Sequence, residues 1–317
     1  EVMIDNQFIG KINGLKLELD LKKGALETDI KSLKKAARQT VGPELEKRIQ
    51  TIIETGLVDL NNDFKIYWNK YPIGRLVSGK NYLNPKIELI VDDILEQNQR
   101  VRLMSFLETW LKSKIDLILK SLVDLKDMKE KNSSIKALAY QLYENNGVLK
   151  REQVSEYLKN LGQAERKVLR DIGVKFGRYH VFLYKLIKPE AVSLRTLLWK
   201  NYHQKFFNLK PPTFGLNFLD SDKTTNKNFM LLCGFEKFEN IYVRIDILER
   251  LFVQIINTNI EKQKEIKMIP EMLNLLGCNK ENFKKLLKSM GYKIMIKENE
   301  VFFKYSPKKS FKKTNKK

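Results

Sequence analysis

The chain has 317 residues, which at roughly 100–200 residues per domain allows two or three domains, each with its own core. Apolar residues make up 43% and aromatic residues 10%, a composition that excludes a wholly disordered chain. The formal net charge of +21 favours a polyanionic partner, with nucleic acid placed before an anionic membrane.

The first 85 residues predict a β-rich module with two helices. In residues 1–20, apolar and polar side chains alternate in three runs that are separated by turn-forming pairs. This pattern predicts a small antiparallel meander. A helix over 29–40 is expected to stop at Gly42, and Pro43 is expected to begin a second helix. Residues 64–77 alternate again and predict a hairpin. Because the chain starts without Met inside a strand pattern, we expect a fragment of a longer protein.

Residues 86–205 predict a helical domain with a short strand pair. Apolar residues at helical spacing mark a long helix over 98–126. Further helices are predicted at 135–145, 151–160, 163–172 and 190–203, with two short strands inside 173–183. The loop-like composition of residues 206–230 predicts a linker.

Residues 231–317 predict a winged-helix-like domain with a basic tail. The expected order is helix, helix, turn, helix and β-hairpin, at 244–257, 268–276, 282–290, 291–296 and 301–305. Residues 304–317 contain seven lysines and no acid, and we expect residues 306–317 to form a disordered basic tail. Taken together, the three parts predict an α+β protein dominated by helices.

Cysteine and histidine are scarce. Cys233 and Cys278 lie far apart and outside any CxxC motif, which indicates a reducing compartment, the cytoplasm, with both thiols buried. With only His180 and His203, we expect neither a zinc site nor a Ser-His-Asp triad. We therefore assign no catalytic residue, no metal and no cofactor to this chain. No apolar run reaches roughly 18 residues, so we expect no membrane partner.

The segment GRLVSGKN (74–81) nearly matches a phosphate-binding loop. That loop needs Ser or Thr after the lysine to hold Mg²⁺, and here the position is Asn81. The apolar run that ends in Asp92 and Asp93 follows too closely for the crossover helix between parallel strands. We expect a hairpin, then an amphipathic helix with both aspartates in solvent, and no ATP hydrolysis by this chain alone.

The strongest candidate for a functional surface is GVKFGRYHVFLYKLIKP (173–189), where basic and aromatic side chains interleave. Basic groups neutralise phosphates, and exposed rings stack on unpaired bases. Residues 145–205 hold 13 Lys and Arg against 5 Asp and Glu. The predicted nucleic-acid contacts are Lys175, Arg178, Tyr179, His180, Lys185 and Lys188. The alternative is an ordinary strand pair, with its rings in the core and its basic groups in solvent.

A second candidate is the predicted helix over 282–290. Its lysines Lys284, Lys285 and Lys288 lie on one side, and in a winged helix the second helix of the pair reads a groove. The alternative is a solvated lysine face. In VRIDILERL (243–251), the four-residue spacing of an acid and a base predicts a surface ion pair between Asp246 and Arg250, and no acid–base catalysis.

Segment 173–189, followed by LRTLLW (194–199), resembles the region beyond the motor in alphaproteobacterial superfamily-2 helicases related to the mitochondrial RNA-degradosome helicase. Members of that family carry a "GVRFGAYHIFLPALLKP…LW" pattern. Further similar stretches are IGKINGLKLELD, PIGRLVSGKNYLNPKIELIVDD, AYQLYENNGVL, GFEKFENIYVRIDILERL and LLGCNKENFKKLLKSMGYKI. Arg178 and Tyr184 depart from the family pattern, which has a small residue and Pro there.

The resemblance implies a nucleic-acid-binding accessory part of an ATP-dependent helicase, with RNA as the expected substrate. ATP and Mg²⁺ would belong to a motor that this chain lacks, and the helicase core would be its partner in cis. Single-stranded RNA or DNA is the expected ligand. The alternative is a protein-interaction scaffold that docks a partner such as a nuclease through the helical domain.

Overall fold

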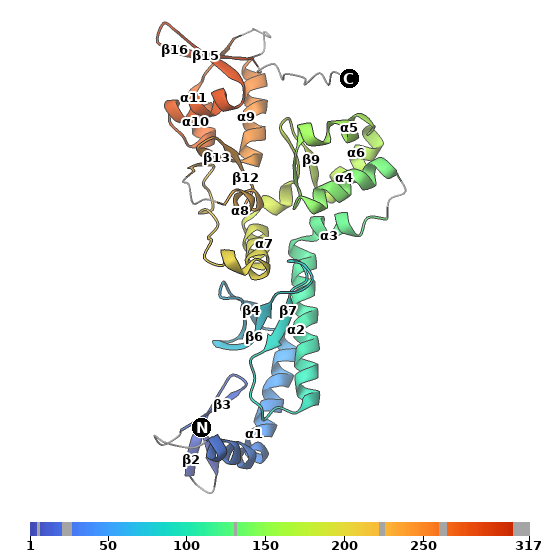
Figure 1. Ribbon diagram of the computed structural model, residues 1–317, viewed down its shortest axis with the longest axis vertical. Coiled ribbons are helices and arrows are strands. Elements are labelled where there is room, and N and C mark those ends of the chain that lie inside the picture. Colours follow the sequence, from blue (N-terminus) through green and yellow to red (C-terminus); the bar gives the residue numbers. More distant parts are fainter. Residues whose placement is uncertain (5–6, 21–26, 130–131, 222–225, 260–264, 307–317) are drawn as a thin grey trace, which may run out of the picture. The chain divides into compact units, whose positions relative to one another are not determined.

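A computed structural model describes residues 1–4, 7–20, 27–129, 132–221, 226–259 and 265–306 (Figure 1). The fold is mixed α+β, as the sequence predicts: 51% of the described residues are helical and 23% are in strands, which form several small sheets. The chain divides into two compact units. The first comprises Glu1–Ile118 and Leu197–Leu209, and the second comprises Leu119–Thr196 and Lys210–Lys317.

A three-stranded antiparallel sheet and a long helix begin the first unit. The elements are β1 (Val2–Ile4), β2 (Gln7–Asn13), β3 (Lys16–Leu19) and α1 (Glu27–Thr55), with sheet order β1-β2-β3. The meander is confirmed, but the predicted break at Gly42 and Pro43 is wrong, since α1 runs through both. An internal proline costs about 3 kcal/mol. The stripe of buried side chains from Ala37 through Val41 to Ile52 continues across it, and its burial offsets that cost.

A four-stranded sheet and a second helix complete most of this unit. Its elements are β4 (Val58–Leu60), β5 (Lys65–Trp68), β6 (Tyr71–Val77), β7 (Lys86–Leu89) and α2 (Gln97–Ile118). The predicted hairpin over 64–77 is confirmed as β5 and β6. The predicted boundary at residue 85 is wrong, because β7 pairs with β6 as the fourth strand. Strand β6 leads into a loop and then β7, so no helix follows GRLVSGKN.

Asp92 corrects a further expectation, since it is buried and lies outside any helix. Its carboxylate accepts backbone N–H groups of Leu17 and Ile94, both at 3.1 Å, and pairs with the Lys34 ammonium at 3.1 Å. Asp93 is exposed, as expected. The role of Asp92 is therefore to connect β3, α1 and the segment before α2.

The second unit begins with short helices around a small sheet. The helices are α3 (Lys120–Lys126), α4 (Ser133–Glu144), α5 (Ser155–Lys159) and α6 (Gln163–Ile172). The strands are β8 (Val148–Lys150), β9 (Val174–Phe176) and β10 (His180–Leu183), in the order β8-β10-β9. Short 3₁₀ turns span Arg151–Val154 and Tyr184–Ile187. Helix α7 (Pro189–Tyr202) begins in this unit, while its end and the 3₁₀ turn Gln204–Phe206 belong to the first unit. The strand pair predicted inside 173–183 is confirmed.

Arg195, on α7, is fully buried in this unit. Its guanidinium donates to the carbonyl oxygens of Asn146 at 2.8 Å and Leu186 at 3.2 Å, and also to that of Leu232. One side chain thus joins three segments that are distant in sequence.

A second small sheet follows in the chain. It contains β11 (Phe218–Asp220), β12 (Phe235–Phe238) and β13 (Ile241–Arg244), in the order β11-β13-β12, with helix α8 (Lys227–Leu232) before β12. The predicted linker over 206–230 is therefore wrong in part, because β11 and α8 lie within it. The Pro-Pro pair and the polar run suggested a loop, but short elements can form between such signals.

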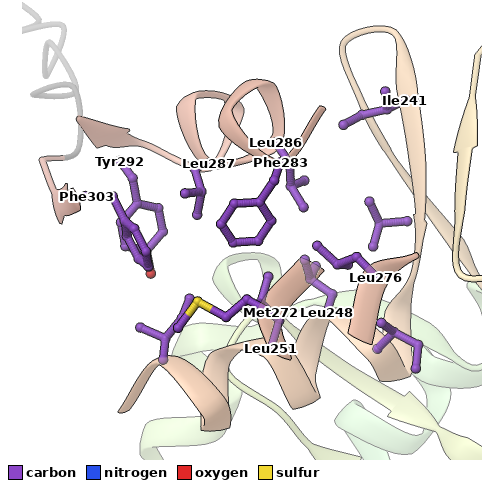
Figure 2. Close-up of a cluster of buried hydrophobic side chains, with 13 residues drawn as sticks. Ile241, Leu248, Leu251, Met272, Leu276, Phe283, Leu286, Leu287, Tyr292 and Phe303 are labelled. Carbon is purple, nitrogen blue, oxygen red and sulfur yellow. The ribbon is translucent and has the colours of Figure 1, made fainter. Parts of the chain in front are cut away.

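The last part of the chain packs around a core of its own (Figure 2). Its elements are α9 (Ile245–Thr258), β14 (Ile266–Lys267), α10 (Pro270–Leu276), α11 (Lys280–Ser289), β15 (Tyr292–Lys297) and β16 (Glu300–Tyr305). The sheet order is β14-β16-β15. Leu248, Met272, Phe283, Leu287 and Phe303 are among the buried residues of this core. The predicted helices and hairpin are present, while the predicted basic tail lies beyond residue 306, outside the described residues.

Two further findings concern predicted absences. Within the part of the chain that the structure describes, no helix is long and apolar enough to cross a membrane. Among the same residues, no group of three or more His, Cys, Asp and Glu side chains could hold a metal ion. Cys233 is buried as expected, whereas Cys278 is only partly buried.

Candidate nucleic-acid interface

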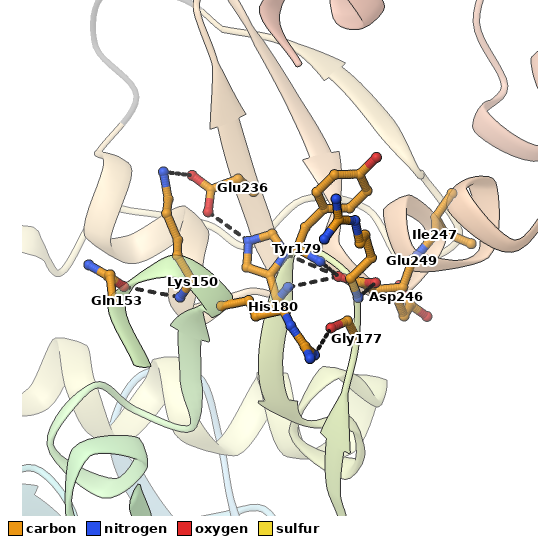
Figure 3. A network of polar contacts seen from close by, with 11 residues as sticks. Lys150, Gln153, Gly177, Tyr179, His180, Glu236, Asp246, Ile247 and Glu249 are labelled. Carbon is orange, nitrogen blue, oxygen red and sulfur yellow. Dashed lines mark hydrogen bonds and ion pairs between the residues drawn. The ribbon is translucent and has the colours of Figure 1, made fainter. Parts of the chain in front are cut away.

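The turn between β9 and β10 is built around a carboxylate from another element. The Glu249 side chain, on α9, accepts backbone N–H groups from Arg178, Tyr179 and His180, the last two at 2.8 Å (Figure 3). Converging backbone N–H groups form an anion-binding nest. A Cβ at Gly177 would lie 2.3 Å from Cδ of Glu249, so only glycine permits this close approach.

His180 lies between two carboxylates in the interior. Its Nε2 lies 2.9 Å from Oε2 of Glu236, on β12, and its Nδ1 lies 3.6 Å from Oε1 of Glu249. The Lys150 ammonium lies 3.5 Å from the other oxygen of Glu236. Figure 3 shows Lys150, Glu236, His180 and Glu249 as one network.

The network shifts the pKa of both of its central groups. Burial lowers the pKa of His180, but its hydrogen bond to Glu236 and the nearby Glu249 carboxylate outweigh burial and raise the pKa above its ordinary value. Burial raises the pKa of Glu236, but its hydrogen bond to His180 and the charge of Lys150 lower it below its ordinary value. The geometry therefore favours a charged imidazolium beside charged carboxylates.

This geometry corrects two of the predicted contact residues. His180 is 2% exposed, so its ring is not available to stack on a base. The Tyr179 ring is partly buried, edge-on to Phe252 at 5.6 Å, and its hydroxyl lies 3.3 Å from that of Tyr292. Both side chains face neighbouring elements of the fold, and their main role is to hold the turn against α9 and β12.

A groove of about 740 Å³ is lined by residues of α6, β9, β10, the segment after β10, β13 and α9. We call it the basic groove, because five cationic side chains line it against two carboxylates. The cations are Arg170, Lys175, Lys188, Arg244 and Arg250, and the acids are Asp246 and Glu249.

Both acids of the basic groove are already engaged by other groups. The Arg244 guanidinium binds Asp246 at 2.7 and 3.0 Å, and the backbone nest binds Glu249. The predicted pair of Asp246 with Arg250 is therefore replaced by a pair with Arg244. Across the described residues, Arg170, Lys175, Lys188 and Arg250 form no ion pair, so the groove keeps a positive field.

Two aromatic rings in the groove already make cation–π contacts, so they are not free to stack on a base. Arg170 lies over the Phe176 ring at 5.6 Å, and Lys175 lies over the Tyr184 ring at 4.8 Å. Such cation–π contacts contribute about 0.5–1 kcal/mol at exposed sites. They also hold the charged groups in place before a ligand arrives.

The remaining predicted residues lie outside the groove. Arg178 is exposed, with its guanidinium over the Phe252 ring at 5.6 Å, and Lys185 is exposed after β10. On α11, Lys284 pairs with Glu281 at 2.9 Å, while Lys285 and Lys288 are exposed. Of the nine predicted contacts, the groove brings together only Lys175 and Lys188.

Sequence reasoning missed three of the groove's cations. Arg170 lies in the last turn of the amphipathic helix α6 before β9, and its place four residues after Arg166 was the available signal. Arg244 and Arg250 lie more than fifty residues further along the chain, so nothing local marks them as neighbours of Lys175.

Comparisons with known proteins add no relative: no protein-family model, no curated protein and no solved structure matches this chain. The functional argument therefore rests on the residues and their arrangement.

Proposed function

We propose that the second unit binds single-stranded nucleic acid along the basic groove. The observation that carries the proposal is the set of four cations, Arg170, Lys175, Lys188 and Arg250, which share one concave surface and form no ion pair with any described residue. The phosphates of a strand would form the ion pairs that these four cations do not form within the described residues. Bound phosphates release counterions, so affinity would fall steeply with salt.

The resemblance supports a role for this binding surface. We propose that the chain is the accessory part of an ATP-dependent helicase that acts on RNA, in which a motor supplied in cis moves the strand and the groove guides it. ATP and Mg²⁺ would bind the motor. We also propose that residues 245–305 form a winged helix, which the order α9, β14, α10, α11, β15, β16 supports.

The groove is tested by charge reversal. Lys175→Glu with Lys188→Glu should weaken binding of a single-stranded RNA about tenfold or more at ~0.1 M salt. The slope of log affinity against log salt should become shallower by about 1.4, because each single-strand phosphate contact contributes about 0.7. Fluorescence anisotropy with a labelled 20-nucleotide RNA, over a range of salt, measures both quantities.

Lys112→Glu with Lys136→Glu is the matched control, since both lysines are exposed on helices outside the groove and the charge change is the same. Equal losses in the two double variants, or a flat salt dependence of the unmodified chain, would contradict the proposal. Salt-insensitive capture of a nuclease without RNA binding would instead support a docking scaffold. A helicase motor encoded upstream in the same reading frame tests the link to helicases.

A further inference from the structure

A second pocket, of about 440 Å³, adjoins the same β9–β10 turn. Gly177 lines the basic groove, whereas the next three residues, Arg178, Tyr179 and His180, line this pocket. Its volume lies in the range of roughly 300–1,000 Å³ that is usual for small-molecule sites. One turn therefore separates a groove suited to phosphates from a smaller pocket.

The pocket combines a small apolar part with a larger number of polar and charged side chains. Phe238, Met290 and Tyr305 line it, and Tyr305 is 51% exposed although its ring packs against Tyr292 at 5.3 Å. Aromatic rings and a polarizable thioether are the side chains on which a planar ligand stacks. Because the large Tyr305 ring is half-exposed beside the pocket, a ligand that packs on it would bury further apolar surface.

The polar groups of the pocket are held in place before any ligand binds. Arg151 donates to the carbonyl oxygen of Gly177 at 2.7 Å, which fixes its guanidinium. The Glu236 carboxylate is 5% exposed and accepts from His180, yet a carboxylate has about four lone-pair sites and so can accept further N–H donors. Lys150 lies beside Glu236.

The charges argue against a bare phosphate in this pocket. Glu152 and Glu236 line it together with Lys150, Arg151, Arg178 and His180, and Lys150 and His180 already pair with Glu236, so the carboxylates offset part of the cationic charge. A neutral planar ring that offers N–H donors at its edge suits such a site better, because it gains stacking and meets an acceptor without bringing a charge.

We propose that this pocket takes a nucleobase, so that a strand whose phosphates lie in the basic groove inserts one base beside Tyr305. The idea that the strand enters the groove rests on the proposed function, but the pocket itself can be tested without it. Since a paired base cannot enter such a pocket, the ligand would be single-stranded or would have an unpaired end.

The first test uses free nucleotides on the full chain. Each of the four nucleoside monophosphates is titrated while the Met290 methyl signal is followed by NMR, with Met290→Leu used to assign that signal. We expect at least one nucleotide to shift the signal, and Tyr305→Leu, which removes the ring but keeps apolar volume, to reduce the shift severalfold. No shift with any of the four nucleotides would overturn the proposal.

The second test compares a natural RNA with an abasic strand of the same length. Tyr305→Leu should weaken binding of the natural RNA about tenfold, a typical stacking contribution, and leave abasic binding and the salt slope unchanged. The control is Tyr140→Leu, because Tyr140 is 61% exposed on α4 and lies outside the pocket. Equal binding of the natural RNA by the Tyr305 variant and the unmodified chain would overturn the proposal.

The two proposals fail in different ways. If reversing Lys175 and Lys188 has no effect while Tyr305→Leu still lowers nucleotide binding, the basic groove is refuted and the pocket stands. If the charge reversal weakens RNA but the Tyr305 and Met290 readouts do not change, the groove stands and the base pocket is refuted.

Discussion

Segment 173–189 and helix α11 have similar lysine-rich sequences but differ in what surrounds their charges. Lys175 and Lys188 of 173–189 line one groove together with arginines from α6, β13 and α9, whereas Lys285 and Lys288 of α11 are exposed outside that groove. A charged face on a single element is common in a chain with this composition. Convergence of cations from several elements on one concave surface is the better indicator of a binding site.

Segment 173–189 and helix α11 also differ in the polar contacts that connect them to the rest of the fold. Tyr179 and His180 hold the turn against α9 and β12, and thereby keep Lys175 and Arg250 in the lining of one groove. Helix α11 has no such buried polar link among the described hydrogen bonds. We first consider variants that remove polar contacts of the 173–189 turn, and then a variant of the lysines of α11.

The largest effect is expected from Glu249→Ala. The change leaves the backbone N–H groups of Arg178, Tyr179 and His180 without their acceptor and removes the carboxylate beside Nδ1 of His180, which should cost about 3 kcal/mol. All three tryptophans belong to the first unit, so their fluorescence would not report this loss. Hydrogen exchange in peptides covering 173–189, measured by mass spectrometry in increasing urea, is the suitable measurement.

The control for that change is Glu156→Ala, which removes a carboxylate from an exposed pair with Lys159. It should change the free energy of unfolding by less than about 1 kcal/mol. Equal exchange rates over 173–189 in the two variants would show that the nest contributes nothing.

A smaller loss, about 2 kcal/mol, is expected from Gly177→Ala. The new Cβ would overlap the Glu249 carboxylate, so the carboxylate must move away from the nest. When Gly177→Ala is added to Glu249→Ala, the further loss of stability should be small, because the carboxylate that the new Cβ would overlap is no longer present. Additive losses in the double variant, measured by the same exchange experiment, would contradict this explanation.

Stability should depend on pH through His180 and Glu236. The pKa of His180 is raised in the fold, so its contribution is complete below its ordinary value of 6.5 and is lost as pH rises through the raised pKa. The pKa of Glu236 is lowered, so its contribution is complete above 4.5 and is lost as pH falls through the lowered pKa. Stability of the turn should therefore be greatest between these two values.

His180→Gln provides the check on that pH dependence. The loss of protection over 173–189 at alkaline pH, after correction for the intrinsic exchange rate, should be absent in the variant. An unchanged pH profile would show that another group is responsible.

The smallest effect is expected from Lys285→Glu with Lys288→Glu. Because α11 presents these lysines outside the groove, RNA affinity should fall no more than in the Lys112 and Lys136 control variant. A loss as large as that from reversing Lys175 and Lys188 would move the interface to α11. Anisotropy titrations of the three double variants at one salt concentration decide between these outcomes.

Short-range sequence patterns correctly predicted the elements whose partners lie nearby in the sequence. The hairpins over 64–77 and 291–305 were readable because turn residues and alternation lie within a few positions of each other. The continuation of α1 through Pro43 was not readable, since it depends on what its buried stripe packs against. The same limit applies to His180, whose partners Glu236 and Glu249 lie more than fifty residues away.

Arg195 and His180 both join distant segments, but only one of the two groups titrates near neutrality. A guanidinium remains charged throughout the accessible pH range, so the three carbonyl groups around Arg195 keep their donor in mild alkali. The imidazole of His180 loses its charge once the pH rises above its raised pKa. A rise in pH through that pKa should therefore release the β9–β10 turn while the junction of α7 with α8 persists, which makes the edge of the groove the first part of this unit to open.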